Sequence, residues 1–141
     1  MKLLPDVQLP ALKSIHLISS GDDVCIKAIV DCNGIVAVSK MLADSSENMQ
    51  LRELSCCTIS NLLADDMARI RTIDNDAIPG LLRMIKGSKE NRKHALNAMQ
   101  QMIKNGDYSQ IKYLVSENCA NQLCDMLTAD LDTSLVALTS Y

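Results

Sequence analysis

The sequence has no Trp and no Phe, and its three Tyr bring aromatic residues to only 2% of the chain. A core must therefore be built from aliphatic residues, Met and Cys, a set that favours helices over sheets. No apolar run approaches the ~18 residues that a membrane-spanning helix needs, and Pro5 follows the short apolar start too early for a signal peptide. With 141 residues, 48% of them hydrophobic, the chain is predicted to form one intracellular globular domain.

Charge of one sign is not concentrated either. The formal net charge is −3, and the basic residues are spread singly along the sequence. This balance supplies no general field that would attract nucleic acid or an anionic membrane, so neither is an expected partner. A basic partner is electrostatically easier to bind than an acidic one.

Metal and redox motifs are missing as well. No C-x-x-C occurs, and His16 and His94 fall in segments that the repeat described below puts in different copies. We therefore expect reduced thiols that pack as small hydrophobes and no metal or cofactor, with a metal or redox protein as the weaker alternative. The six thiols concerned are Cys25, Cys32, Cys56, Cys57, Cys119 and Cys124. The sequence also shows no nucleophile–base pairing and no phosphate loop, so it predicts no enzyme.

A degenerate repeat dominates what the sequence does contain. The segment 30–42 aligns with 73–85 and 115–127, at offsets of 43 and 42 residues. Four columns keep their character: Val38, Leu81 and Leu123; Met41, Met84 and Met126; Leu42, Ile85 and Leu127; and the small residues Gly34, Ala77 and Cys119. Each copy reads as a short helical piece (25–30, 68–73 or 110–115), a tight corner with Asn or Asp and a small residue, and a helix of about ten residues. The small residue would let the two helices cross closely.

A third, longer helical segment follows a polar stretch in each copy. Residues 51–62 align with 91–102 and with 7–18. Apolar or small residues recur at i, i+4 and i+7, which is the pattern of one buried helix face. This predicted stripe comprises Ala11, Ile15 and Ile18; Ser55, Ile59 and Leu62; and Ala95, Met99 and Met102. Another helical segment is expected at 135–141.

Three helices per repeat of about 42 residues is the armadillo period, because tetratricopeptide and ankyrin units are shorter and have two helices. The predicted fold is all-α: an armadillo-repeat, right-handed superhelical solenoid fragment of about three repeats. The expected organisation is a single solenoid over 1–141, with approximate repeats 1–20 (partial), 21–64, 65–106 and 107–141 (partial). The outer repeats should fray. Neither end has an obvious polar cap, which suggests a piece of a longer array; an atypical capping repeat is the alternative.

The chain resembles importin-α, the armadillo-repeat adaptor of nuclear import, over nearly its whole length. The resemblance is to the C-terminal half of that array and is carried by the segments 11–13 with 21–23, 56–61, 110–115 and 123–127. It implies that the third helices line a concave groove, where a Trp and an Asn four residues later hold a lysine-rich extended peptide. The Asn amides would pair with the peptide backbone, and the indoles would form slots for lysine stems.

The resemblance also implies a set of peptide-binding residues, several of them altered. Asn61 matches the family's Asn, Lys13 matches a basic residue, and Ser20 and Asp23 match groove residues. Cys57 and Asn97 stand where the family has Trp, and Gln101 stands where it has Asn. Leu17 likewise occupies an expected Asn position, and Leu54 and His94 occupy acidic ones. The loss of two cation–π sites would cost roughly 1–4 kcal/mol of peptide binding.

Two interpretations follow from this resemblance. The first is an importin-α-like adaptor module of the cytoplasm and nucleus, which binds nuclear-localisation-signal-type basic peptides for protein import into the nucleus. A counterpart of the family's basic segment that binds importin-β is not expected in this sequence. The alternative is a degenerate armadillo scaffold that binds other proteins and no longer recognises such signals.

Overall fold

The computed structural model describes residues 5–44, 48–87 and 89–128. Every regular element in these ranges is a helix, so the all-α prediction is confirmed for them. The labelled helices are α1 (Pro5–Ser19), α2 (Asp23–Asp31), α3 (Gly34–Asp44), α4 (Met49–Leu62), α5 (Asp66–Asp74), α6 (Ala77–Ile85), α7 (Lys89–Asn105) and α8 (Tyr108–Ser116), and residues 119–128 are helical too. The helix expected at 135–141 lies outside the described residues.

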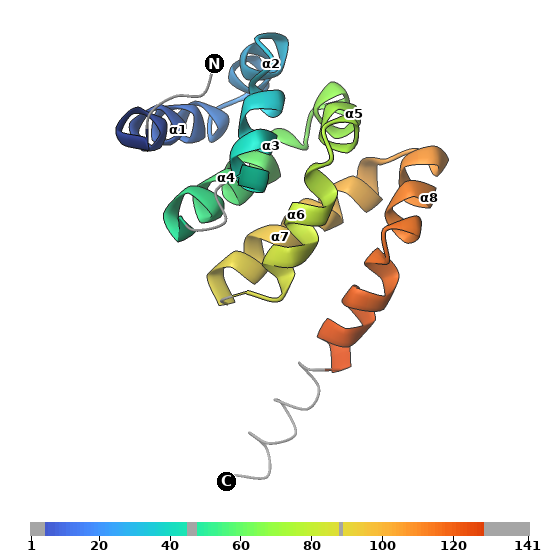
Figure 1. Ribbon diagram of the computed structural model, residues 1–141. Helices are drawn as coiled ribbons and strands as arrows, with labels where there is room; N and C mark the ends of the chain where they lie inside the picture. The colour runs from blue at the N-terminus through green and yellow to red at the C-terminus, as the bar shows by residue number, and fades with distance from the viewer. Residues whose placement is uncertain (1–4, 45–47, 88, 129–141) are drawn as a thin grey trace, which may run out of the picture.

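The helices stack with their neighbours along the chain in two rows. The long helix α4 packs against α1 on one side and α7 on the other, while α3 packs against α6. Figure 1 shows α3 and α6 in front of α4 and α7, with α2 and α5 at one end of the pairs. The predicted short, medium and long segments therefore occur in that order, and the long helices of successive copies lie beside one another. The repeat boundaries themselves stay a prediction.

The corner between the first and second helices is the same in each copy. Asn33, Asp76 and Asn118 have φ angles of 63°, 55° and 69°. Asn and Asp tolerate this left-handed backbone better than most residues. The residue that follows must be small: a Cβ on Gly34 would lie 2.3 Å from Cγ2 of Ile29. The prediction that small residues allow close crossing at this corner thus has a direct steric reason.

The first helix of each copy also begins in the same way. The carboxylates of Asp22, Asp65 and Asp107 accept hydrogen bonds from the backbone N–H three residues later, at 3.1, 3.1 and 2.8 Å. Such N-caps satisfy N–H groups that have no partner within the helix. The carboxylate of Asp22 has a lowered pKa because these hydrogen bonds favour its charged form. The caps explain why the helices begin two residues before the predicted segments.

The core lies between the two rows of helices, and most of its buried residues come from α3, α4, α6 and α7. The predicted stripe on α4 and α7 is fully buried, and Val38 and Leu81 are 0% exposed. The stripe on α1 was only partly correct: Ile15 is half-buried against the core, but Ile18 is 48% exposed, and Leu12 and Ser19 are buried instead. Among the described helices, α1 packs mainly on α2 and α4, so only one flank of it is covered. Burial also declines towards residue 128, since Leu127 is 65% exposed.

None of the described helices is both long enough and apolar enough to cross a membrane.

Candidate functional site

The predicted peptide-binding residues lie mostly on α1, α4 and α7. We call the predicted residues on these three helices, together with Ser20 and Asp23 at the junction of α1 and α2, the third-helix face. Cys57, Asn61 and Gln101 are half-buried, whereas Lys13, Ser20, Asp23 and Asn97 are exposed. Asp23 is the first residue of α2 and lies next to the end of α1. The structure connects some of these residues directly and leaves others apart.

Asn61 joins α4 to the end of α1. Its Nδ2 donates to Oγ of Ser19 at 3.1 Å and approaches Oγ of Ser20 at 3.5 Å. Both serine hydroxyls donate in turn to the backbone carbonyl of His16, at 2.6 and 3.1 Å. These directions are consistent, because each serine oxygen accepts from the amide while its own proton goes to the carbonyl. The amide group of Asn61 is thereby fixed in orientation.

A second amide joins α7 to α4. Nδ2 of Asn97 donates to Oγ of Ser60 at 2.6 Å. Farther along α7, Oε1 of Gln101 accepts from Nδ2 of Asn105 at 3.0 Å. Asn97 therefore holds two neighbouring third helices together, in the position where the resemblance placed an aromatic slot. Gln101 is bonded within its own helix and not to the preceding one.

Cys57 lies beside His16, which the sequence had not indicated as a site residue. Sγ of Cys57 is 3.9 Å from Nε2 of His16, and Oγ1 of Thr58 is 3.4 Å from Nδ1. Thr58 donates its hydroxyl proton to the carbonyl of Leu54 at 2.7 Å, so Nδ1 of the imidazole must be the donor to Thr58. Nε2 is then free to accept from the Cys57 thiol. This arrangement suits a neutral imidazole and a neutral thiol.

The electrostatics of this pair agree with that assignment. Partial burial lowers the pKa of His16, and the nearby charge of His94 on α7 lowers it further. The two histidines, expected in different repeats, thus lie in different helices and still interact electrostatically. Burial raises the pKa of the Cys57 thiol. A thiol with a raised pKa is a poor nucleophile, so this pair lacks the features of a reactive cysteine.

Lys13 and Asp23 remain apart from this network. Neither makes a side-chain hydrogen bond or ion pair with another of the predicted site residues in the described part of the chain. Lys13 is the only basic residue among those predicted for the site, and Asp23 is the only acidic one. The face therefore offers amides, hydroxyls, one thiol and neighbouring imidazoles, with little charge of either sign.

The residues missed by sequence reasoning are Ser19, Ser60, His16 and Thr58. Their contacts join residues separated by about one repeat: 42 positions for Asn61 with Ser19, and 42 for Thr58 with His16. Arg71 similarly donates to the carbonyl of Val30, 41 positions earlier. A search for polar pairs one period apart would have found Ser19, His16 and Thr58, because neighbouring copies stack with equivalent helices side by side. It would have missed Ser60, which lies 37 positions before Asn97.

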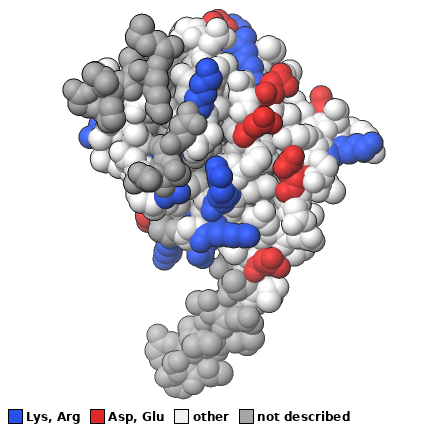
Figure 2. All heavy atoms as spheres, viewed as in Figure 1, with Lys and Arg blue, Asp and Glu red and all other residues white. Residues whose placement is uncertain are grey.

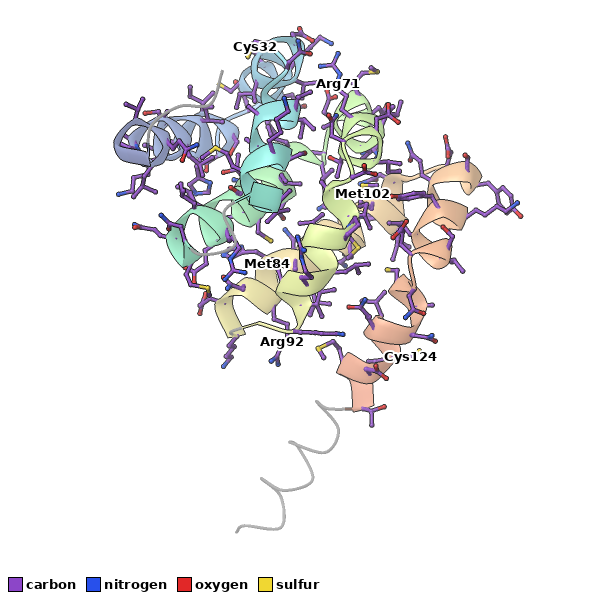
Figure 3. The ribbon with its side chains drawn as sticks, in the orientation of Figure 1. Cys32, Arg71, Met84, Arg92, Met102 and Cys124 are labelled. Carbon is purple, nitrogen blue, oxygen red and sulfur yellow. The ribbon has the colours of Figure 1, made fainter. Side chains whose placement is uncertain are left out.

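All six cysteines are free; Cys56 and Cys119 are buried, and Cys32 and Cys124 are exposed (Figure 3). The cysteines therefore occur both in the core and at the surface. Within residues 5–44, 48–87 and 89–128, no three His, Cys, Asp or Glu side chains gather as metal ligands would.

Comparisons with known proteins can now be set beside this geometry. No protein-family model matches the chain. It is 31% identical over 125 residues to importin subunit alpha-8 of Arabidopsis thaliana, a match that covers 87% of this chain and 28% of that protein. It is 34% identical over 91 residues to importin subunit alpha-5 of Arabidopsis thaliana, covering 62% and 18%. Importin subunit alpha-1a of Oryza sativa subsp. japonica is 32% identical over 78 residues, covering 55% and 15%.

A solved structure agrees with these sequence matches. The crystal structure of an engineered protein superposes with a TM-score of 0.79 and 27% identity, covering 91% of this chain and 51% of that one. The chain is thus distantly similar to plant importin-α subunits over most of its length, with an armadillo-like helical repeat fold. It spans between 15% and 28% of the length of the curated relatives that it matches.

Proposed function

We propose that the third-helix face binds an extended basic peptide. In this proposal the chain acts as an importin-α-like adaptor for protein import from the cytoplasm into the nucleus. The observation that carries this proposal is the fixed amide of Asn61, the family-like residue at the junction of α1 and α4. Its Nδ2 donates to Oγ of Ser19, and this hydrogen bond also fixes the orientation of Oδ1 in the same planar amide. Oδ1 can then accept a hydrogen bond from a peptide N–H. A preoriented amide loses little rotational freedom when it binds.

The rest of the face would contribute less than in a complete peptide groove. Cys57 and Asn97 supply no aromatic ring for a lysine stem, and Asn97 is already bonded to Ser60. Asp23 at the start of α2 is the one carboxylate available among the predicted residues to meet a lysine ammonium. We therefore expect weak binding that depends on salt concentration, because a single exposed charge pair is easily screened.

Fluorescence anisotropy tests this proposal directly. The full chain is titrated into a fluorescein-labelled peptide of five lysines flanked by glycines, at low and at physiological salt. Binding should strengthen at low salt, and Asn61→Ala should weaken it by roughly 3- to 10-fold, the effect of losing one or two neutral hydrogen bonds.

The control is Asn121→Ala, because Asn121 carries the same amide group but is exposed on the helix after the α8 corner. It should leave the affinity unchanged. Absence of any anisotropy change up to millimolar protein would reject peptide binding. Equal weakening by both alanine variants would reject the role assigned to Asn61.

A scaffold that binds other proteins is the second candidate, and a specific observation favours it. The amides of Asn61 and Asn97 both donate to serines of the preceding third helix. Side chains that bridge neighbouring copies in this way stabilise the stack, whatever the face binds. In that case a natural partner would bind without these amides, and Asn61→Ala would lower the stability of the chain while leaving partner affinity unchanged.

A further inference from the structure

A cavity on another side of the molecule is not explained by peptide binding at the third-helix face. It has a volume of about 230 Å³ and lies between the end of α3, the start of α4, the end of α6 and the segment entering α7. We call it the α3–α6 notch. Its wall combines two guanidinium groups, Arg52 and Arg83, with the apolar side chains of Leu42, Met49 and Met84.

The guanidinium of Arg52 is partly withdrawn from water without being neutralised. The residue is half-buried, and its Nε is buried without a hydrogen-bond acceptor in the described part of the chain. One terminal nitrogen contacts the thioether sulfur of Met49, which is a weak acceptor. A buried donor without an acceptor carries a desolvation cost, so this guanidinium is held partly out of water with only a weak acceptor of its own.

Arg83 lines the same cavity from α6 and is exposed. The ion pair that the described residues form is Arg69 with Asp66, so no described carboxylate neutralises Arg83 or Arg52. The two arginines are 31 positions apart in the sequence and line one cavity because α4 and α6 converge there. Basic residues that are spread singly in the sequence can therefore lie together in the fold.

The surroundings of the notch are basic. Lys86 ends α6, Lys89 begins α7, and Arg92 donates to the carbonyls of Ile85 and Gly87 (Figure 3). Between residues 83 and 93 there are five Lys or Arg and one acidic residue, Glu90. Figure 2 shows Lys and Arg side chains gathered over the part of this face where α3 and α6 lie, and acidic side chains mainly towards α5. On the α6–α7 side of the notch the basic side chains therefore favour an anion, although the net charge of the chain is −3 and the segment 42–53 on the other side contains Asp44, Glu47 and Glu53.

The apolar part of the wall narrows the chemical class of ligand. Leu42, Met49 and Met84 would contact a hydrocarbon stem, whereas a free inorganic anion gains nothing from them. Guanidinium groups match a carboxylate in a two-bond geometry. We propose that the α3–α6 notch binds a Glu side chain of an acidic, partly apolar peptide segment from another protein. This site would work independently of the third-helix face and prefers the opposite charge.

The test is an NMR titration of the full, uniformly ¹⁵N-labelled chain. The probe is a capped six-residue peptide, Ser-Leu-Glu-Leu-Glu-Ser. Amide shifts should change around residues 42–43, 49–52, 80–84 and 87, and binding should weaken with salt. Arg83→Gln should weaken binding about 5-fold or more, because it removes one charge-assisted contact. Arg83 is exposed, so this variant should keep the fold.

Lys104→Gln is the matched charge control, because Lys104 is exposed on α7 and does not line the notch. It should change the affinity by less than about 2-fold, as expected for a distant, screened charge. The peptide with both Glu replaced by Gln should not bind.

Three results would overturn the proposal. The first is equal binding of the Gln peptide or of Arg83→Gln. The second is that inorganic phosphate shifts the same amides at concentrations where the peptide does not, which would assign the notch to a simple oxyanion. The third is an equal loss of affinity in Lys104→Gln, which would assign binding to the general charge of the chain and not to the notch.

Discussion

The hydrogen bond between Asn97 and Ser60 offers a sharp test of how neighbouring copies are held together. Nδ2 of Asn97 on α7 donates to Oγ of Ser60 on α4 at 2.6 Å. The two partners differ in exposure, since Ser60 is 5% exposed whereas Asn97 is exposed to solvent. This asymmetry allows the two single variants to be ranked before they are measured.

Asn97→Ala leaves the buried hydroxyl of Ser60 without this donor. An unsatisfied buried polar group costs about 1–3 kcal/mol, so we expect the free energy of unfolding to fall by that amount. Ser60→Ala removes the buried hydroxyl itself, and the exposed amide of Asn97 can turn towards water. Only the net worth of the hydrogen bond is then lost, about 0.5–1.5 kcal/mol. Asn97→Ala should therefore destabilise more than Ser60→Ala.

The assay is urea unfolding of both single variants and the double variant, followed by far-ultraviolet circular dichroism and by tyrosine fluorescence. The two probes must coincide for a single free energy to apply. The double variant should be less destabilised than the sum of the single variants, because both remove the same contact. Gln100→Ala, an exposed change on α7, controls for helix propensity. Strict additivity, or a larger effect of Ser60→Ala, would refute the reasoning.

Two further changes test the neighbourhood of the face and the core. Burial is the main reason why the pKa of His16 in the folded state lies below its ordinary value of 6.5. As pH falls, the unfolded chain therefore binds this proton first, and the free energy of unfolding should drop progressively below pH 6.5. His16→Gln should flatten the pH dependence of the urea midpoint. A midpoint that rises from pH 7 to 5.5 would contradict this sign. Met99→Ala removes a 0% exposed side chain beside the thiol of Cys119 and should lower the free energy of unfolding in urea by about 2–4 kcal/mol. Ile103→Ala, at 39% exposure on the same helix, should lower it clearly less. Similar losses would mean that Met99 is not packed in the core as described.

Much of the fold could be predicted from the sequence because each local feature recurs in several copies of the repeat. The corners with Asn or Asp and a small residue were predicted. Their physical reasons are the left-handed φ angles of Asn33, Asp76 and Asn118 and the clash that a Cβ on Gly34 would make. The caps at Asp22 and Asp65 stand at one-period spacing in the sequence, although the predicted helical segments began two residues after the helices do. Local chemistry that recurs in every copy is therefore predictable from one sequence.

The stripe on α1 and the partners of the amides were not predictable in the same way. Whether Ile18 is buried depends on which helices cover α1. Its aligned counterpart Leu62 is buried because it packs in a cluster with apolar residues of α2, α3 and α5. The bond from Asn61 to Ser19 likewise depends on the sideways register of two helices. A periodic pattern fixes which face of a helix is apolar, but the neighbour decides how much of it is covered.

The third helices link the two proposed sites without making them one. On α4, Arg52 lies in the first turn at the notch, whereas Asn61 lies in the last turn at the end of α1. Nine residues of α-helix separate them by roughly 14 Å along the axis. A basic peptide at Asn61 and an acidic one at Arg52 would thus meet different turns and opposite charges. Arg83→Gln should leave lysine-peptide binding intact, and Asn61→Ala should leave acidic-peptide binding intact, so either proposal can fail without the other.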